Sequence, residues 1–211
     1  MVATAEKSRK KLSKPPISLE SLVYETLGGK PLYYRGYKEA LAGKKTKEEI
    51  MSCSSFQSTL VTLLVLFLGS RINRKKYLIN SNEAGLHLSK NNNLGLDLAI
   101  FDKENLPQIN EKFFDVPPKI VIEVDIKAEI ELSDFPAKEM DYIFEKSQKL
   151  LDFGVEKVIW ITTRTRKVFL ATKTDTWIII DWHMDFELME GHQLNIKQLL
   201  DDEGIDYQGI Q

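Results

Sequence analysis

The chain has 211 residues, of which 43% are hydrophobic and 28% are charged, and these fractions are typical of a globular protein rather than a disordered or fibrous one. Its 29 Lys and Arg residues against 31 Asp and Glu residues give a formal net charge of −2, which excludes a protein that holds nucleic acid by bulk positive charge. The longest uninterrupted apolar stretch, Leu63 to Leu68, is too short to cross a bilayer, so no membrane partner is expected.

The sequence predicts two parts of the chain, a tail and a domain. Residues 1–16 carry five basic side chains against Glu6 alone and end in Pro15-Pro16, which predicts a flexible basic tail. Residues 17–211 are long enough to form one domain with a sizeable core. The one cysteine, Cys53, excludes an internal disulfide, so a reducing compartment and a cytoplasmic location are expected.

Helical patterns come first along the chain. Ser18 predicts the cap of a short helix that ends at Gly28-Gly29. Residues 31–47 are aromatic and basic and predict no particular element. A longer helix is expected from Ser54 or Ser55 to about Arg71, and because it is apolar nearly all round it should be central and buried.

Beyond Arg71 the hydrophobic period changes to that of strands, with Asn, Gly and Pro clusters between the segments. A helix from about Ala137 to Phe153, closed by Gly154, interrupts the strands, and a short helix is expected near the end of the chain. The predicted strands are 77–82, 84–89, 94–102, 119–127, 155–163, 167–172 and 176–182, and the last helix is 195–203. This order indicates an α/β fold with a mixed sheet flanked by helices.

The strand KIVIEVDIK, residues 119–127, is the most informative segment. Side chains alternate between the faces of a strand, so Glu123, Asp125 and Lys127 share one face and the apolar residues share the other. A half-exposed strand would also alternate in this way. A central strand between helices should be apolar on both faces, however, and charged residues in such a place require partners or a metal.

The strand LGLDLAIFD, residues 94–102, repeats the arrangement. Asp97 lies between the small residues Gly95 and Ala99, which leave room beside its carboxylate. If the two strands are neighbours, Asp97 meets Glu123 or Asp125 across the sheet. Converging carboxylates repel one another, a divalent cation removes that repulsion, and oxygen ligands favour Mg²⁺ or Mn²⁺. A nearby lysine could then balance charge on a phosphate.

An aspartate followed some distance later by acid-x-acid-x-lysine on a hydrophobic strand resembles the PD-(D/E)XK nuclease superfamily, which has the restriction-endonuclease-like fold. More closely, the chain resembles a branch of restriction-endonuclease-like proteins that is abundant in cyanobacteria and was long catalogued as a domain of unknown function. The resemblance covers nearly the whole chain after the tail and rests on KPLYYRGYKEALAGKKTKEEIMSCSS, NEAGLHLSKNNNLGLDLAIFDKENL, VPPKIVIEVDIKAEIE and YIFEKSQKLLDFGVEKVIWI.

The resemblance implies a metal-dependent endonuclease that hydrolyses DNA phosphodiester bonds with Mg²⁺ or Mn²⁺, and many related nucleases work as homodimers. Asp97 takes the place of the aspartate in the "PD" element, although Leu96 stands where the family has proline. Glu123 takes the acidic position of the next motif as the second metal ligand, and Val124 would lend its backbone carbonyl.

The catalytic lysine has two candidates. In one register Asp125 and Lys127 form a D-x-K, and in the other Glu123 and Asp125 are the acid pair and the lysine has moved to the next helix. Lys146 fits the second register because it stands eight residues before Gly154. The resemblance therefore implies Asp97, Glu123 and Asp125 as metal ligands, with Lys127 and Lys146 sharing the cationic role.

Other residues carry weaker expectations. Glu49 lies where many such nucleases have an additional helical acid, but it could equally begin a solvated helix. Glu83 is expected to be a surface group, and Cys53 a small buried residue. The alternative function is a catalytically inactive module that binds nucleic acid or protein on the same fold. A structural homodimer is a third possibility.

Overall fold

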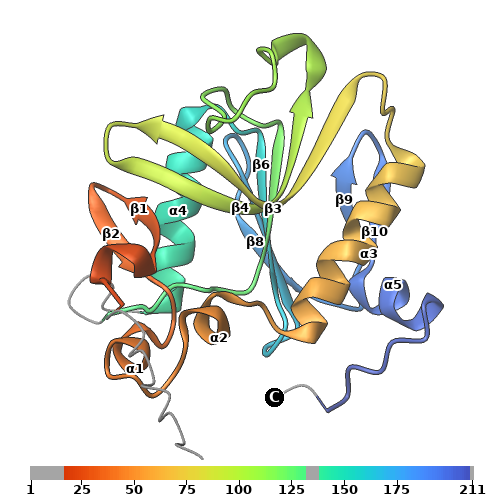
Figure 1. Cartoon of the computed structure of the whole chain (residues 1–211). Coiled ribbons are helices and arrows are strands. Elements are labelled where there is room, and N and C mark those ends of the chain that lie inside the picture. The colour runs from red at the N-terminus through yellow and green to blue at the C-terminus, as the bar shows by residue number, and fades with distance from the viewer. Residues whose placement is uncertain (1–16, 132–137, 210–211) are drawn as a thin grey trace, which may run out of the picture.

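The computed structural model describes residues 17–131 and 138–209, so the predicted basic tail, residues 1–16, lies outside the described residues. A twisted sheet of eight strands separates two apolar layers (Figure 1). One layer contains helix α3 (Ser55–Arg71), and helix α4 (Glu139–Phe153) lies on the other side of the sheet. The predicted α/β fold with helices flanking a mixed sheet is confirmed.

The strand order is β2-β1-β4-β5-β6-β7-β8, and β3 pairs with β4 along nearly its whole length. Within the described part of the chain, β5 and β6 run parallel and the other paired strands of this sheet run antiparallel. The strands are β1 (Val23–Leu27), β2 (Lys30–Tyr33), β3 (Tyr77–Ser89), β4 (Asn92–Asp102), β5 (Ile120–Val124), β6 (Lys157–Thr162), β7 (Lys167–Thr172) and β8 (Ile178–Asp181).

Helix α3 forms as its sequence predicts. The Ser54 side chain accepts the backbone N–H of Gln57 and caps the first turn. Leu60, Leu64 and Leu68 are each 0% exposed and pack against the apolar residues of β5 and β6 that face this side of the sheet. The same layer is completed by the hairpin β9 (Phe186–Met189) and β10 (His192–Leu194) and by helix α5 (Ile196–Asp202).

Helix α4 packs on the opposite face. The indole N–H of Trp160 on β6 donates to the Ser147 hydroxyl, at 2.9 Å between the two heavy atoms. The helix ends at Gly154, which has φ 125°, a value that residues with a side chain rarely adopt. A Cβ added at Gly154 would lie 3.0 Å from Pro117, so both the backbone and the neighbouring chain require glycine here.

The first predicted helix is wrong beyond its first turn. Ser18 caps a short 3₁₀ turn, Leu19–Leu22, and the chain then turns into the hairpin of β1 and β2. Gly28-Gly29, expected to end a helix, instead make the hairpin turn with φ 60° and 79°. The stretch without a predicted element contains β2 and the short helices α1 (Tyr37–Leu41) and α2 (Lys47–Met51).

We expect Leu60→Ala to lower the free energy of unfolding by roughly 2–5 kcal/mol, because the lost side chain leaves a cavity between α3 and the sheet. Leu66→Ala on the same helix is the matched control: Leu66 is 61% exposed, so its truncation should change stability by less than about 0.5 kcal/mol. Urea unfolding followed by circular dichroism measures both. Equal losses in the two variants would contradict the placement of α3.

Candidate functional site

The candidate site lies where β4 and β5 run side by side. All five residues of β5 are buried, so the strand is central as expected. The antiparallel register pairs Leu98 with Ile122, and Asp97 and Glu123 are the next residues of their strands. Their side chains are 5% and 1% exposed, so the sheet brings two carboxylates together in its interior.

Asp97 is held by two donors. Its Oδ2 accepts the backbone N–H of Val124 at 2.9 Å, and its Oδ1 lies 2.9 Å from the Lys127 ammonium nitrogen. The first bond ties β4 to the end of β5, and the second is an ion pair in a setting with little solvent, because the Lys127 side chain is 15% exposed. Asp97 is thus tied both to the end of β5 and to the lysine that follows this strand.

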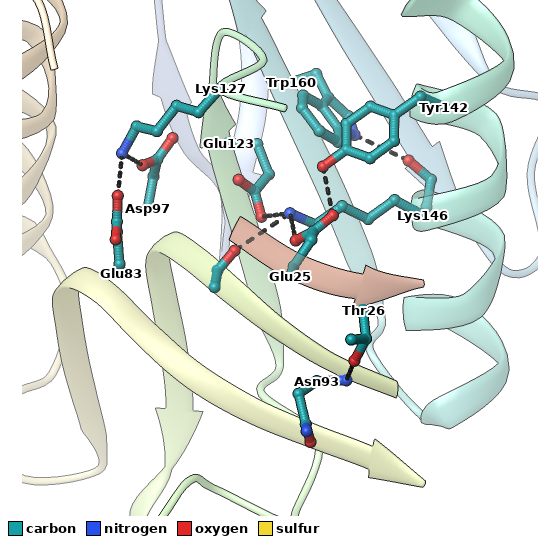
Figure 2. A network of polar contacts seen from close by, with 12 residues as sticks. Glu25, Thr26, Glu83, Asn93, Asp97, Glu123, Lys127, Tyr142, Lys146 and Trp160 are labelled. Atoms are coloured by element: carbon teal, nitrogen blue, oxygen red, sulfur yellow. Dashed lines mark hydrogen bonds and ion pairs between the residues drawn. The ribbon is translucent and has the colours of Figure 1, made fainter. Parts of the chain in front are cut away.

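Glu83 joins the same lysine and is a site residue that the sequence did not indicate. Its Oε1 lies 2.8 Å from Lys127 Nζ, so the lysine bridges Glu83 and Asp97 (Figure 2). Asn82 and Glu83 have φ 67° and 56°, and the β3–β4 register shifts between Ser81 and Ala84. This bulge, with two consecutive left-handed residues, turns the Glu83 side chain into the site, as bulges near functional sites often do.

The charge of Lys127 is stabilised by these partners. Burial acts to lower its pKa, but the charges and hydrogen bonds of Asp97 and Glu83 outweigh burial, and the net pKa is raised. Lys127 therefore stays protonated across the physiological range. A cation held in this way at the border of a cavity can receive a negatively charged group.

Lys146 forms a second, deeper centre. Its side chain is 0% exposed, and its Nζ lies 3.0 Å from Glu25 and 3.1 Å from Glu123 (Figure 2). The same nitrogen donates to the backbone carbonyl of Gly95 at 3.2 Å. Glu25, on β1, also accepts the Tyr142 hydroxyl at 2.5 Å. Glu25 was not predicted, because it lies in the segment that the sequence assigned to a helix.

The protonation of Glu123 follows from this burial. Burial raises the pKa of the Glu123 carboxyl to about 8, with Asp97 and Glu25 adding to the shift and Lys146 opposing it. Its Oε1 lies 3.1 Å from the Lys146 ammonium nitrogen, so Lys146 is the cation that partners this buried oxygen.

Asp125 does not lie with Glu123, although strand alternation predicts that it should. The strand ends at Val124, and Asp125 has φ 59°. Its two carboxylate oxygens accept the backbone N–H and the hydroxyl of Thr163, at 2.7 and 2.6 Å. Burial raises the pKa of Asp125 and the bonds from Thr163 oppose the rise. Among the residues the structure describes, no three Asp, Glu, His or Cys side chains are grouped so as to hold a metal ion.

Glu49 serves a local structural purpose. Its carboxylate accepts the Thr46 backbone N–H at 2.6 Å, and Thr46 Oγ1 accepts the Glu49 N–H, which together form the capping box of α2. The interpretation as the solvated start of a helix therefore matches its contacts better than that of a catalytic acid. The buried polar residue from this region is instead Gln57 on α3, whose side-chain amide donates to the Val124 carbonyl at 2.5 Å.

A cleft of about 930 Å³ opens beside these residues. Lys127, Asp125 and Gln57 line it, and its walls come from α2, the starts of α3 and α4, and strands β7 and β8. Cys53 also lines the cleft and is exposed, so the expectation that it is buried is wrong. Of the two candidate catalytic lysines, a ligand in the cleft can therefore reach Lys127, whereas Lys146 is enclosed by protein.

The donor set fits one divalent cation held by few protein ligands. Four carboxylates, Glu25, Glu83, Asp97 and Glu123, are neutralised by two lysines only, which leaves an excess of negative charge when all are ionised. Mg²⁺ is commonly bound through one or two carboxylates, with waters and substrate phosphates completing its octahedron. Asp97 and Glu123 fit that pattern, and the contacts of Asp125 do not add it as a third ligand.

The comparisons with known proteins were made against family models, curated proteins and solved structures. A scan against models of protein families and a search of curated proteins both find nothing that matches. Among solved structures, the chain is similar to a protein of Anabaena variabilis described as a "putative nuclease belonging to DUF820". The two share 13% sequence identity, the match covers 84% of this chain and 89% of the other, and the TM-score is 0.62. At this identity the similarity shows the fold.

The described helices include none with the length and apolar character that a membrane span requires.

The pKa of Glu123 predicts how stability depends on pH. The folded protein retains this proton up to about pH 8, whereas the unfolded chain releases it near the ordinary value of 4.5, so stability should fall as the pH rises between these values. Each unit of difference corresponds to about 1.4 kcal/mol, so the loss should be on the order of a few kcal/mol. Glu123→Gln mimics the protonated acid and should flatten this part of the profile.

Urea unfolding in EDTA at several pH values between 5 and 8.5 tests this expectation. Glu104→Gln, at an exposed position in the short 3₁₀ turn Lys103–Asn105 after β4, is the matched change of charge and should leave the profile parallel to that of the wild type. If Glu123→Gln also runs parallel to the wild type, Glu123 is ionised in the folded protein at neutral pH.

Proposed function

We propose that the protein is a metal-dependent endonuclease that hydrolyses DNA phosphodiester bonds. The observation that carries the proposal is that Lys127 lines the cleft and is paired with Asp97 beside the buried Glu123. The similarity in fold to a protein described as a nuclease, together with the order of acids and lysine along β4 and β5, supports the same conclusion.

Each residue has a role that its contacts permit. Asp97 and Glu123 would hold a Mg²⁺ or Mn²⁺ ion, and the chemistry that such an ion would supply is Lewis-acid polarisation of a phosphate oxygen and activation of water. Lys127 would contact the scissile phosphate and balance the charge that develops on it. Glu83 holds the lysine in position and would remain its partner if Asp97 bound a metal ion.

Lys146 acts at one remove from the substrate. It is completely buried, so its role is to fix the Glu123 carboxylate and to limit the repulsion between Glu123 and Asp97. Glu25 and Tyr142 hold Lys146 in turn, which makes β1 part of the support of the site. The two lysines therefore have different roles: Lys127 would contact the substrate, and Lys146 contacts the metal ligand Glu123.

The second candidate function is an inactive module on the same fold that binds nucleic acid or protein. The observation that favours it is the engagement of Asp125 by Thr163, which leaves two carboxylates rather than three for a metal. Calorimetric titration with Mn²⁺ separates the candidates: uptake that Asp97→Asn abolishes supports the nuclease, and no uptake at millimolar Mn²⁺ supports the module.

A homodimer is also proposed. Strand β8 lies at the edge of the sheet and pairs only with β7 among the described strands. The backbone groups on the outer side of an edge strand are suited to pairing with a second strand. Sedimentation of the full chain at micromolar concentration measures the state directly.

Asp97→Asn and Glu123→Gln should each reduce cleavage of plasmid DNA in Mg²⁺ or Mn²⁺ by about 100-fold or more, because each removes a ligand charge. Asp125→Asn is the matched control: asparagine tolerates the left-handed backbone of this position, so activity should stay within about tenfold of the wild type. Nicking rates on agarose gels report all three. Cleavage that persists in Asp97→Asn would place the active site elsewhere.

Lys127→Met should lower kcat by roughly 100-fold, and Glu83→Gln by about tenfold, because the first removes the cation and the second loosens its position. Lys75→Met, at an exposed lysine of the loop before β3, should leave the rate unchanged. A Glu83→Gln variant with wild-type kcat would show that Lys127 is positioned by Asp97 alone.

A further inference from the structure

The cleft has a chemical character that the catalytic residues do not require. Its lining carries five basic side chains, Arg35, Lys45, Lys127, Arg164 and Lys167. The three lysines have carboxylate partners of their own, which are Glu39 for Lys45, Asp97 and Glu83 for Lys127, and Asp181 for Lys167. The two arginines are therefore the groups of the lining that can attract an anionic ligand.

The two arginines of the lining are only partly neutralised by their ion pairs. Glu139 is the partner of both Arg35, at 3.0 Å, and Arg164, at 3.6 Å, so one carboxylate faces two guanidinium groups. The side chains of the two arginines are 56% and 72% exposed. Exposed guanidinium groups suit phosphate oxygens, which they bind through paired hydrogen bonds.

One wall of the same cleft is apolar. Phe169 of β7 and Ile179 of β8 are partners across the strand pair, and Ile143 of α4 lies on the same lining. Ile179 is 53% exposed. An apolar wall in the same cleft as two exposed arginines matches a molecule that carries anionic groups on one side and flat apolar faces on the other.

The apolar wall of the cleft distinguishes between forms of DNA. The volume of about 930 Å³ does not, because a duplex can lie across an open cleft without entering it. In a duplex the faces of the bases are stacked inside and cannot touch the wall. Bases of an unpaired strand are free to pack against apolar and aromatic side chains.

We propose that the cleft binds a single unpaired DNA strand, with its backbone along Arg35, Arg164 and Lys127 and a base against Phe169 and Ile179. This inference rests on the proposed function, since it names the substrate form that the site at Asp97 and Lys127 receives. It assigns substrate selection to residues of β7 and β8 that hold neither the metal nor the scissile phosphate.

Binding is measured with the wild-type chain in EDTA, so that cleavage does not interfere. The probes are a fluorescein-labelled oligothymidylate of roughly a dozen nucleotides and a blunt hairpin duplex of similar length, followed by fluorescence anisotropy. The expected result is a Kd at least about tenfold lower for the single strand. Equal affinity, or tighter binding of the duplex, would overturn the proposal.

Variants locate the contact. Phe169→Leu and Ile179→Ala should weaken single-strand binding by roughly fivefold or more, because packing of one base is worth about 1–3 kcal/mol. Ile178→Ala is the matched control, since Ile178 is exposed on the same strand and does not line the cleft. Arg164→Ala should reduce the slope of log Kd against log salt by about 1. Single-strand binding that both wall variants leave unchanged would also overturn the proposal.

Cleavage assays in Mg²⁺ separate this inference from the proposed function. If duplex plasmid is cut as fast as single-stranded circular DNA of the same sequence, the nuclease proposal is supported and the proposed preference for unpaired strands is rejected. If single-strand binding depends on Phe169 and Ile179 but no cleavage occurs in Mg²⁺ or Mn²⁺, the proposal that the cleft binds an unpaired strand is supported and the proposed nuclease function is rejected.

Discussion

The ion pair of Lys146 with Glu123 and Glu25 is the interaction on which the site depends. A fully buried ammonium group is costly unless charged partners surround it, and here two carboxylates and a backbone carbonyl do so. The three partners come from β1, β4 and β5, and the lysine comes from α4. One side chain therefore joins the first hairpin, the centre of the sheet and its covering helix, and it fixes the carboxylate of Glu123 where β4 presents Asp97.

The other lysine of the site, Lys127, lies where the sheet borders the cleft. Lys127 follows the end of β5, where Asp125 leaves the strand and the Asp97 carboxylate takes the Val124 N–H. Three residues after the last residue of β5, Lys127 forms its ion pairs with Asp97 and Glu83 and lines the cleft. A buried acid with a raised pKa beside a cation that stays charged is the kind of electrostatic asymmetry that marks a functional site. Lys146 is enclosed and fixes Glu123, whereas Lys127 lines the cleft.

The parts of the fold with strong hydrophobic periods could be predicted. Helix α3 was found within a residue of its bounds because its apolar residues surround it and serine caps it. Asp97 and Glu123 stood out because acids interrupt segments that are otherwise apolar. The β1 hairpin was missed because two glycines can end a helix or form a turn, and local sequence does not decide which. Glu83 was missed because its bulge interrupts the alternation that would have revealed its face.

The sequence by itself determined the elements that bury their residues, the mixed sheet and the two acids at its centre, because burial requires a hydrophobic period that can be read along the chain. Tertiary structure alone decided which charged groups meet. Glu25, Glu83 and Gln57 come from three separate elements, and their places depend on strand order, on a bulge and on a helix packed across the sheet. Tertiary structure also turned Asp125 toward Thr163, since one left-handed residue overrides the alternation of a strand.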